Sequence, residues 1–176
     1  MNKGKSWVVL LSVFLAFLIF SSFVHSGDKD ELDSLRGLKG IYVLIENLPP
    51  DIEEKGGLTK DQIRTDIELK LRLAGIKVIP KEDRFGIPGW PFLYVNVDAR
   101  RNLPGLIIYS VSISLEQQVN LSRDPKIRIN ATTWSSESHG SAGEAGMVSW
   151  IRNSIKDHVD RFINDYLSVN PKEERK

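Results

Sequence analysis

The sequence predicts an α+β fold, a two-layer sandwich in which two helices cover one face of a mainly antiparallel sheet. Two stretches, 109–115 and 127–134, alternate between apolar and polar residues, and an Asp-Pro turn signal lies between them. Two other stretches, 59–74 and 147–169, repeat apolar residues at helical spacing along one side. One-sided helices need a surface to cover, and the predicted hairpin supplies the middle of that surface.

The predicted order of elements is β-α-β-β-β-β-α. Strands are expected at 41–45, 76–79, 92–99, 106–115 and 127–134. Thr59 and Gln62 have the spacing of a capping box at the start of the first helix, and Gly75 suits its end. The first strand, this helix and the short strand 76–79 fit a right-handed βαβ unit, while an antiparallel placement of 76–79 stays open.

The strand that begins at residue 106 continues past its apolar part. Gln117 and Gln118 interrupt the apolar alternation, and the polar turn residues follow only at 122–126. Because strands usually have about 5–6 residues, we expect the tip 117–126 to project beyond the core.

The N-terminus has the pattern of a secretory signal peptide. Lys3 and Lys5 precede the apolar run 7–20, and small residues follow up to Ser26. An uncleaved membrane anchor is the alternative, since 7–24 is about the minimum length that spans a bilayer. Both interpretations place the rest of the chain outside the cytoplasm, in the periplasm or secreted.

The remaining sequence divides into three parts. Residues 27–40 are charged and lack a strong period, so they are expected to form a linker. Residues 41–171 are expected to form a single α+β domain, and 172–176 a charged, solvated tail.

The composition excludes several kinds of site. The chain has no cysteine, which excludes disulfides, thiolate zinc sites and the acylated cysteine of a lipoprotein. Once His25 leaves with the signal peptide only two histidines remain, which excludes a histidine-rich metal site, and no cofactor is expected. The net charge of +1 gives no reason to expect nucleic acid or an anionic membrane surface. Membrane contact is expected only through an uncleaved N-terminal segment.

The main candidate for ligand binding lies between the last strand and the last helix. Gly140, Gly143 and Gly146 are expected to form a loop before the helix, where backbone N–H groups favour anions. Their spacing matches neither the phosphate loop nor the dinucleotide fingerprint, and a plain connector is the alternative. His139 starts this loop, but nothing local fixes a nucleophile beside it, so no catalytic residue is assigned.

Other polar and aromatic residues are weaker candidates. Asn96, Asp98 and Arg100 share one strand face, which fits either a ligand-binding row or a solvated surface. His158, inside the last helix, has no neighbour in the sequence that completes a metal set. The expected partner contact combines an aromatic loop with the projecting tip. These residues are Phe85, Trp90, Gln117, Gln118 and Arg123.

Four stretches resemble small exported bacterial proteins of unknown function. They are 58–69, 92–97, 131–135 and 162–171. More distantly, the order of elements resembles the lipopolysaccharide-assembly lipoprotein and the N-terminal domain of TolB-type proteins, although the missing cysteine departs from the lipoprotein pattern. The resemblance implies an envelope location and supplies no catalytic residues.

The functional expectation is an exported, non-enzymatic binding or accessory domain of the bacterial cell envelope, with an envelope protein as partner. The alternative is an exported hydrolase or small-anion binder that uses His139 and the residues 140–146.

Overall fold

A computed structural model of the 176-residue chain describes residues 29–55 and 57–171. The elements are α2 (Lys29–Ser34), β1 (Tyr42–Ile45), the π-helical turn η2 (Asp51–Lys55), α3 (Lys60–Leu73), the 3₁₀ helix η3 (Glu82–Gly86), β2 (Phe92–Leu103), β3 (Leu106–Leu121), β4 (Asp124–Gly143) and α4 (Met147–Val169). The predicted signal peptide or anchor and the charged tail lie outside the described residues. Within the described part, none of the helices has the length and apolar character needed to cross a membrane.

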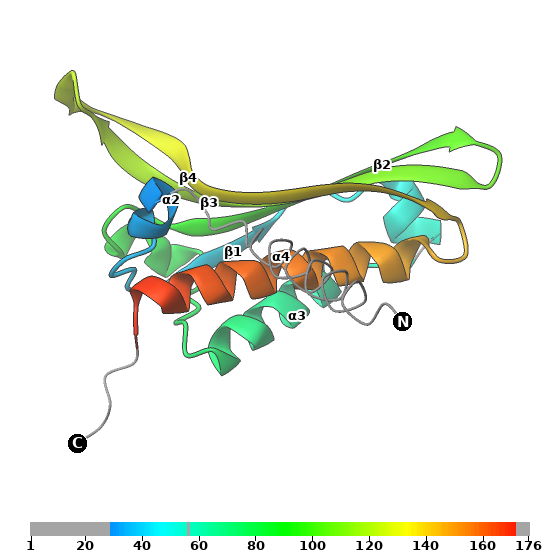
Figure 1. The fold of residues 1–176 in the computed structure, drawn as a ribbon, viewed down its shortest axis with the longest axis horizontal. Coiled ribbons are helices and arrows are strands. Elements are labelled where there is room, and N and C mark those ends of the chain that lie inside the picture. The colour runs from blue at the N-terminus through cyan, green and yellow to red at the C-terminus, as the bar shows by residue number, and fades with distance from the viewer. Residues whose placement is uncertain (1–28, 56, 172–176) are drawn as a thin grey trace, which may run out of the picture.

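The predicted α+β class is confirmed. The four strands form one sheet in the order β1-β2-β3-β4, with β1 parallel to β2 and the other neighbours antiparallel. Helices α3 and α4 lie together on one face of this sheet, and the opposite face is left largely open (Figure 1). The core fills the space between the two layers.

One predicted strand is reduced to a single bridge. Val78 forms an isolated parallel bridge with Ile41, whose N–H donates to the Lys77 carbonyl at 2.9 Å. The sheet therefore has four strands and not five, although the parallel placement is correct. Pro80 has no N–H and cannot extend the pairing. The apolar pattern that predicted a strand here arises from Ile76 and Ile79, whose side chains are buried in the core.

The expected linker belongs to the folded domain, so that prediction is wrong for the described residues 29–40. Residues 29–34 form α2, and Leu35 has no exposed surface. Asn170 at the end of α4 holds this segment, because its side-chain amide donates to the Leu35 carbonyl at 3.0 Å and its oxygen accepts from the Gly37 N–H at 2.7 Å. A six-residue helix is too short to show a period in the sequence.

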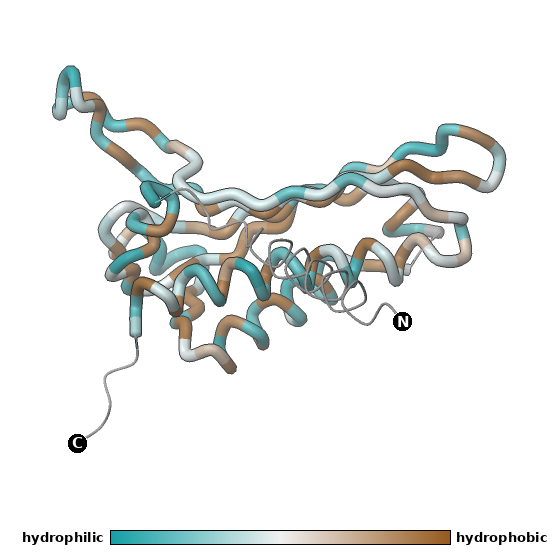
Figure 2. The backbone as a smooth tube through the Cα atoms, in the orientation of Figure 1, coloured by the Kyte–Doolittle hydropathy of each residue, from teal (hydrophilic) through white to brown (hydrophobic). Residues whose placement is uncertain are grey.

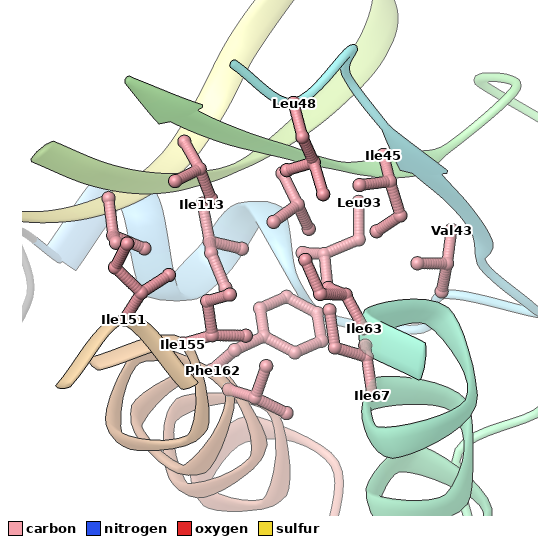
Figure 3. Packing of buried hydrophobic residues seen from close by; sticks show 14 of the residues in the cluster. Val43, Ile45, Leu48, Ile63, Ile67, Leu93, Ile113, Ile151, Ile155 and Phe162 are labelled. Atoms are coloured by element: carbon pink, nitrogen blue, oxygen red, sulfur yellow. The ribbon is translucent and has the colours of Figure 1, made fainter. Parts of the chain in front are cut away.

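Apolar stripes on the two long helices build the core. Thr59 caps α3 through the predicted capping box, and Ile63, Ile67 and Leu71 are buried on its inner side. From α4, Ile151, Ile155, Val159 and Phe162 point at the same sheet face. Figure 3 shows Ile63, Ile67, Ile155 and Phe162 meeting Val43, Leu93 and Ile113 from the strands.

Trp134 joins the sheet to α4. Its indole has no exposed surface and meets the Phe162 ring edge to face at a centroid distance of 5.0 Å. The indole N–H donates to Asp165 Oδ2 at 2.9 Å, which satisfies its buried polar group. The register of β3 and β4 shifts immediately beyond Trp134, between Leu115 and Glu116.

Beyond this shift the strands leave the helices, as expected from the length of the third strand. Residues 116–132 form the β3–β4 arm, which rises from the sheet away from α3 and α4 (Figure 1). The turn differs from the predicted one, since Leu121 pairs with Asp124 and only Ser122 and Arg123 lie between them. The Asp124 carboxylate accepts from the Lys126 N–H at 3.0 Å and so stabilises the first residues of β4.

The pairing of Tyr109 with Gly140 predicts a sharp difference between two glycines of β4. A Cβ atom at Gly140 would lie 2.6 Å from Tyr109 Cζ, whereas at Gly143 it would meet only the Gly105 carbonyl oxygen, at 3.8 Å. Gly140→Ala is expected to lower the free energy of unfolding by about 1–3 kcal/mol through overpacking. Gly143→Ala, the matched control, is expected to stay within about 0.5 kcal/mol. Urea unfolding of the two variants measures this, and equal losses would contradict the packing role of Gly140.

Candidate functional site

The glycine-rich loop expected before the last helix does not form. Strand β4 continues to Gly143, with His139 opposite Ser110 and Gly140 opposite Tyr109. Only Gly146 stands at the start of α4, as its N-cap. The sequence did not predict that residues 136–143 are part of a strand, because a composition of mainly Ser, Gly and Ala is not typical of strands. The close approach of the Tyr109 ring requires a residue without Cβ at Gly140.

The open face of the sheet brings together residues that the sequence kept apart. On β2 it carries the predicted polar row Asn96, Asp98 and Arg100. The strand register places Asp98 beside Ser110, and Ser110 in turn beside His139. Residues directly opposite each other in an antiparallel pair have Cβ atoms about 5 Å apart. Two separate candidates, the polar row and His139, therefore form one surface.

A pocket of about 350 Å³ lies on this surface, which is within the range of small-molecule sites. It is lined by Asp98, Arg100, Arg101, Asn102, Ile108, Tyr109, Ser110 and His139. The Arg100 guanidinium lies 3.3 Å from the Asp98 carboxylate, and Arg101 pairs with Glu144 at the rim. The lining thus offers both hydrogen-bond donors and acceptors, and each of its two arginines has a carboxylate partner.

The row Asp98, Ser110, His139 does not have the order of a catalytic triad. In a triad the imidazole stands between the acid and the hydroxyl, so that the acid orients it. Here Ser110 is the middle residue and separates Asp98 from His139. The row therefore provides a histidine beside a serine without an acid to hold the histidine. Within 29–55 and 57–171, no group of three His, Asp or Glu residues is placed to hold a metal ion.

A second polar cluster lies under α4 and was missed from the sequence. His158 Nδ1 lies 2.7 Å from Ser136 Oγ, and its Nε2 lies 2.9 Å from Ser138 Oγ, which in turn contacts Ser154 Oγ at 2.6 Å. Ser136 and Ser138 belong to β4, some twenty residues away in sequence, so spacing along the last helix contained no signal for them. The neutral imidazole donates through one nitrogen and accepts through the other, and it ties α4 to β4.

Burial lowers the pKa of His158 below its ordinary value of 6.5. The nearby Arg161 adds to this shift, while Asp157 and Glu137 oppose it. The charged form is therefore disfavoured in the folded protein, which suits a side chain with two serine partners and little contact with water.

The predicted partner residues fall into two groups. Phe85 and Trp90 stack edge to face at 5.3 Å, and the Gln118 N–H donates to the Gly89 carbonyl at 2.7 Å, so this loop lies at the base of the β3–β4 arm. Gln117 points inward instead, where its amide donates to Thr133 Oγ1 at 2.7 Å and to the Ser34 carbonyl at 3.2 Å. Arg123 lies in the turn at the far end of the arm.

The aromatic loop is partly a plug on the sheet and partly exposed. The Arg84 guanidinium lies over the rings of Phe85 and Phe92, with centroid distances of 4.7 and 4.8 Å. Phe85 still exposes 55% of its surface. Trp90 has a φ of +48°, which is an outlier for a bulky residue and identifies a strained turn.

No known protein family matches the sequence, and no curated protein matches it. Among solved structures, the chain is similar to a minor lipoprotein from Acinetobacter baumannii, with 15% sequence identity and a TM-score of 0.41. The similarity covers 77% of this chain and 95% of that chain. A likeness at this level gives no ground for transferring a role to this chain.

The lowered pKa of His158 predicts how stability depends on pH. The unfolded chain takes up the proton near pH 6.5, before the folded one does, so the contribution of neutral His158 is complete above about pH 6.5 and is lost as the pH falls through the folded pKa. Replacing the imidazole by a side chain that does not titrate, in His158→Gln, is expected to remove this part of the acid destabilisation. Urea unfolding between pH 5 and 8 measures it, and an unchanged slope in the variant would contradict the assignment.

Proposed function

We propose that the chain is an exported, non-enzymatic binding domain of the bacterial cell envelope, and that it binds its ligand on the open face of the sheet. The observation that carries the proposal is the pocket between Asp98, Arg100, Ser110 and His139. The signal-peptide pattern of residues 1–26 supports the location outside the cytoplasm.

The chemistry of the pocket supports a small neutral or zwitterionic ligand. Asp98 accepts hydrogen bonds, Arg100 donates them and Ser110 does both, while the exposed side chain of Ile108 adds an apolar contact. An amino sugar or an amino acid offers matching groups at this size, and both are building blocks of bacterial envelopes. A simple phosphate anion is less suitable, because the carboxylate of Asp98 stands beside the guanidinium.

A hydrolase remains the second candidate, and one observation favours it. Ser110 and His139 are direct neighbours across β3 and β4, which is the pair that nucleophilic catalysis requires. The acid on the wrong side of the serine weighs against it. The other alternative, anion binding by a loop at 140–146, loses its basis because 140–143 is a strand.

Ligand binding can be tested by the melting temperature. A panel of amino sugars, amino acids and inorganic phosphate is screened against the full chain, and a ligand at about 100 times its Kd is expected to raise the Tm by roughly 5 °C or more. Arg100→Ala and His139→Ala are each expected to reduce that shift. Arg64→Ala, which changes a partly exposed arginine on α3, is the matched control and is expected to keep it.

Two results would contradict the proposal. One is a full shift in both Arg100→Ala and His139→Ala, which would place the ligand elsewhere. The other is turnover of a bound ligand that disappears in His139→Ala while the variant stays folded, which would show a hydrolase.

A further inference from the structure

The β3–β4 arm has two chemically different sides. On β3 the alternation of the core-facing residues continues past the end of the helices to Val119 and Leu121. On β4 the register shift beside Trp134 brings the odd-numbered residues to this side, so Ile129 lies directly opposite Val119 and Ile127 follows on the same side. Nothing in the described part of the chain covers this side fully, and Ile127 and Ile129 each remain 42% exposed. The arm therefore carries an aliphatic strip beyond the core.

Positive charge lies in the turn of the arm and on the side opposite this strip. Arg123 lies in the turn and Lys126 and Arg128 lie on β4, against Asp124 beside the turn and Glu116 at the base of the arm. In residues 29–55 and 57–171, no carboxylate forms an ion pair with any of these three cations. The near-neutral total charge of the chain thus conceals a local excess of positive charge at one projecting end.

The opposite end of the sheet rises toward the same side. There the β2–β3 hairpin end carries Leu103 and Ile108, which expose 58% and 45% of their surface. Figure 1 shows both ends bending away from the helix layer, and Figure 2 shows apolar stretches in both. Arg100 and Arg101 are paired with Asp98 and Glu144, so this end adds apolar contact and little free charge.

We propose that the β3–β4 arm places its tip in the headgroup layer of an anionic phospholipid bilayer. Aliphatic side chains flanked by lysine and arginine are the features of segments that lie in this layer, where each cation near the surface contributes to the attraction. The β3 strand of the arm has six residues, so the tip reaches about 20 Å beyond the register shift.

Other occupants fit the arm less well. A second copy would bring the same three cations together across a two-fold axis, where they repel. A protein interface usually has aromatic anchors at its centre, and residues 116–132 contain none. Basic residues also guard free strand edges, which accounts for Lys126 and Arg128 but not for Arg123 in the turn. The proposal departs from the expectation that only the N-terminal segment contacts a membrane.

The absence of cysteine allows a site-specific test on the full chain. Ile127→Cys is labelled with a polarity-sensitive fluorophore, and vesicles of phosphatidylcholine with 30% phosphatidylglycerol are compared with vesicles of phosphatidylcholine alone. The anionic vesicles are expected to shift the emission to the blue. Leu69→Cys carries the same label at a similarly exposed leucine on α3 and is expected not to respond. This comparison separates the arm from membrane attachment through the N-terminus, which both variants share.

The charge requirement is tested in the same background. Changing Arg123, Lys126 and Arg128 together to glutamine is expected to weaken the lipid response about 100-fold, since each cation contributes roughly five-fold, and 0.5 M salt is expected to weaken it as well. An unaltered Tm shows that the variant is folded.

Several outcomes would overturn the proposal. The first is an emission of the Ile127→Cys label that does not change with anionic vesicles, and the second is an equal shift with both kinds of vesicle. The third is an equal shift of the label at Leu69→Cys. The fourth is a blue shift that appears without lipid and grows with protein concentration, which would indicate a second copy. The pocket on the open face is tested without vesicles, so either proposal can fail alone.

Discussion

The contact of Trp134 with α4 is the interaction on which the rest of the structure depends. It lies at the last pair of β3 and β4 before their register shifts, since Leu115 lies opposite Trp134 and Glu116 lies opposite Thr132. The aromatic pair with Phe162 contributes about 0.5–1.5 kcal/mol beyond simple burial, and the bond to Asp165 fixes the direction of the ring. On one side of this pair α3 and α4 cover the sheet, and on the other β3 and β4 continue as a two-stranded arm.

Because both long helices lie on one face of the sheet, the aliphatic side chains of the core and the pocket residues Asp98, Ser110 and His139 are on opposite faces. Aliphatic side chains from α3 and α4 fill the inner face, and the buried cluster around His158 satisfies the polar groups that remain there. The outer face carries the serines of β3 between mostly polar side chains of β2 and β4, and it contributes little to the core. Residues such as Asp98 and His139 are therefore available for a ligand without a cost in packing.

The sequence predicted the fold class well and the site poorly, for physical reasons. Long segments with a regular apolar period were predicted correctly, because the period differs between a helix and a strand. Examples are α3, α4 and the alternating part of β3. Residues 136–143 were not predicted as a strand, because small residues adapt to any backbone and only the facing Tyr109 ring requires them. The neighbours of His139 and His158 depend on strand register, which the sequence does not specify over such separations. Nothing in the sequence indicated that the aromatic loop contacts the arm, and a backbone hydrogen bond from Gln118 to Gly89 joins them.

The two ends of the described domain meet at Asn170, which holds the backbone at Leu35 and Gly37. Strand β1 likewise pairs with β2 only after a helix and two loops, with Tyr42 opposite Phe92. Contacts so distant along the chain make folding slow, since the loops close before the pairings stabilise them. The core is incomplete without the last helix, because Ile151, Ile155, Val159 and Phe162 of α4 cover the inner face of the sheet.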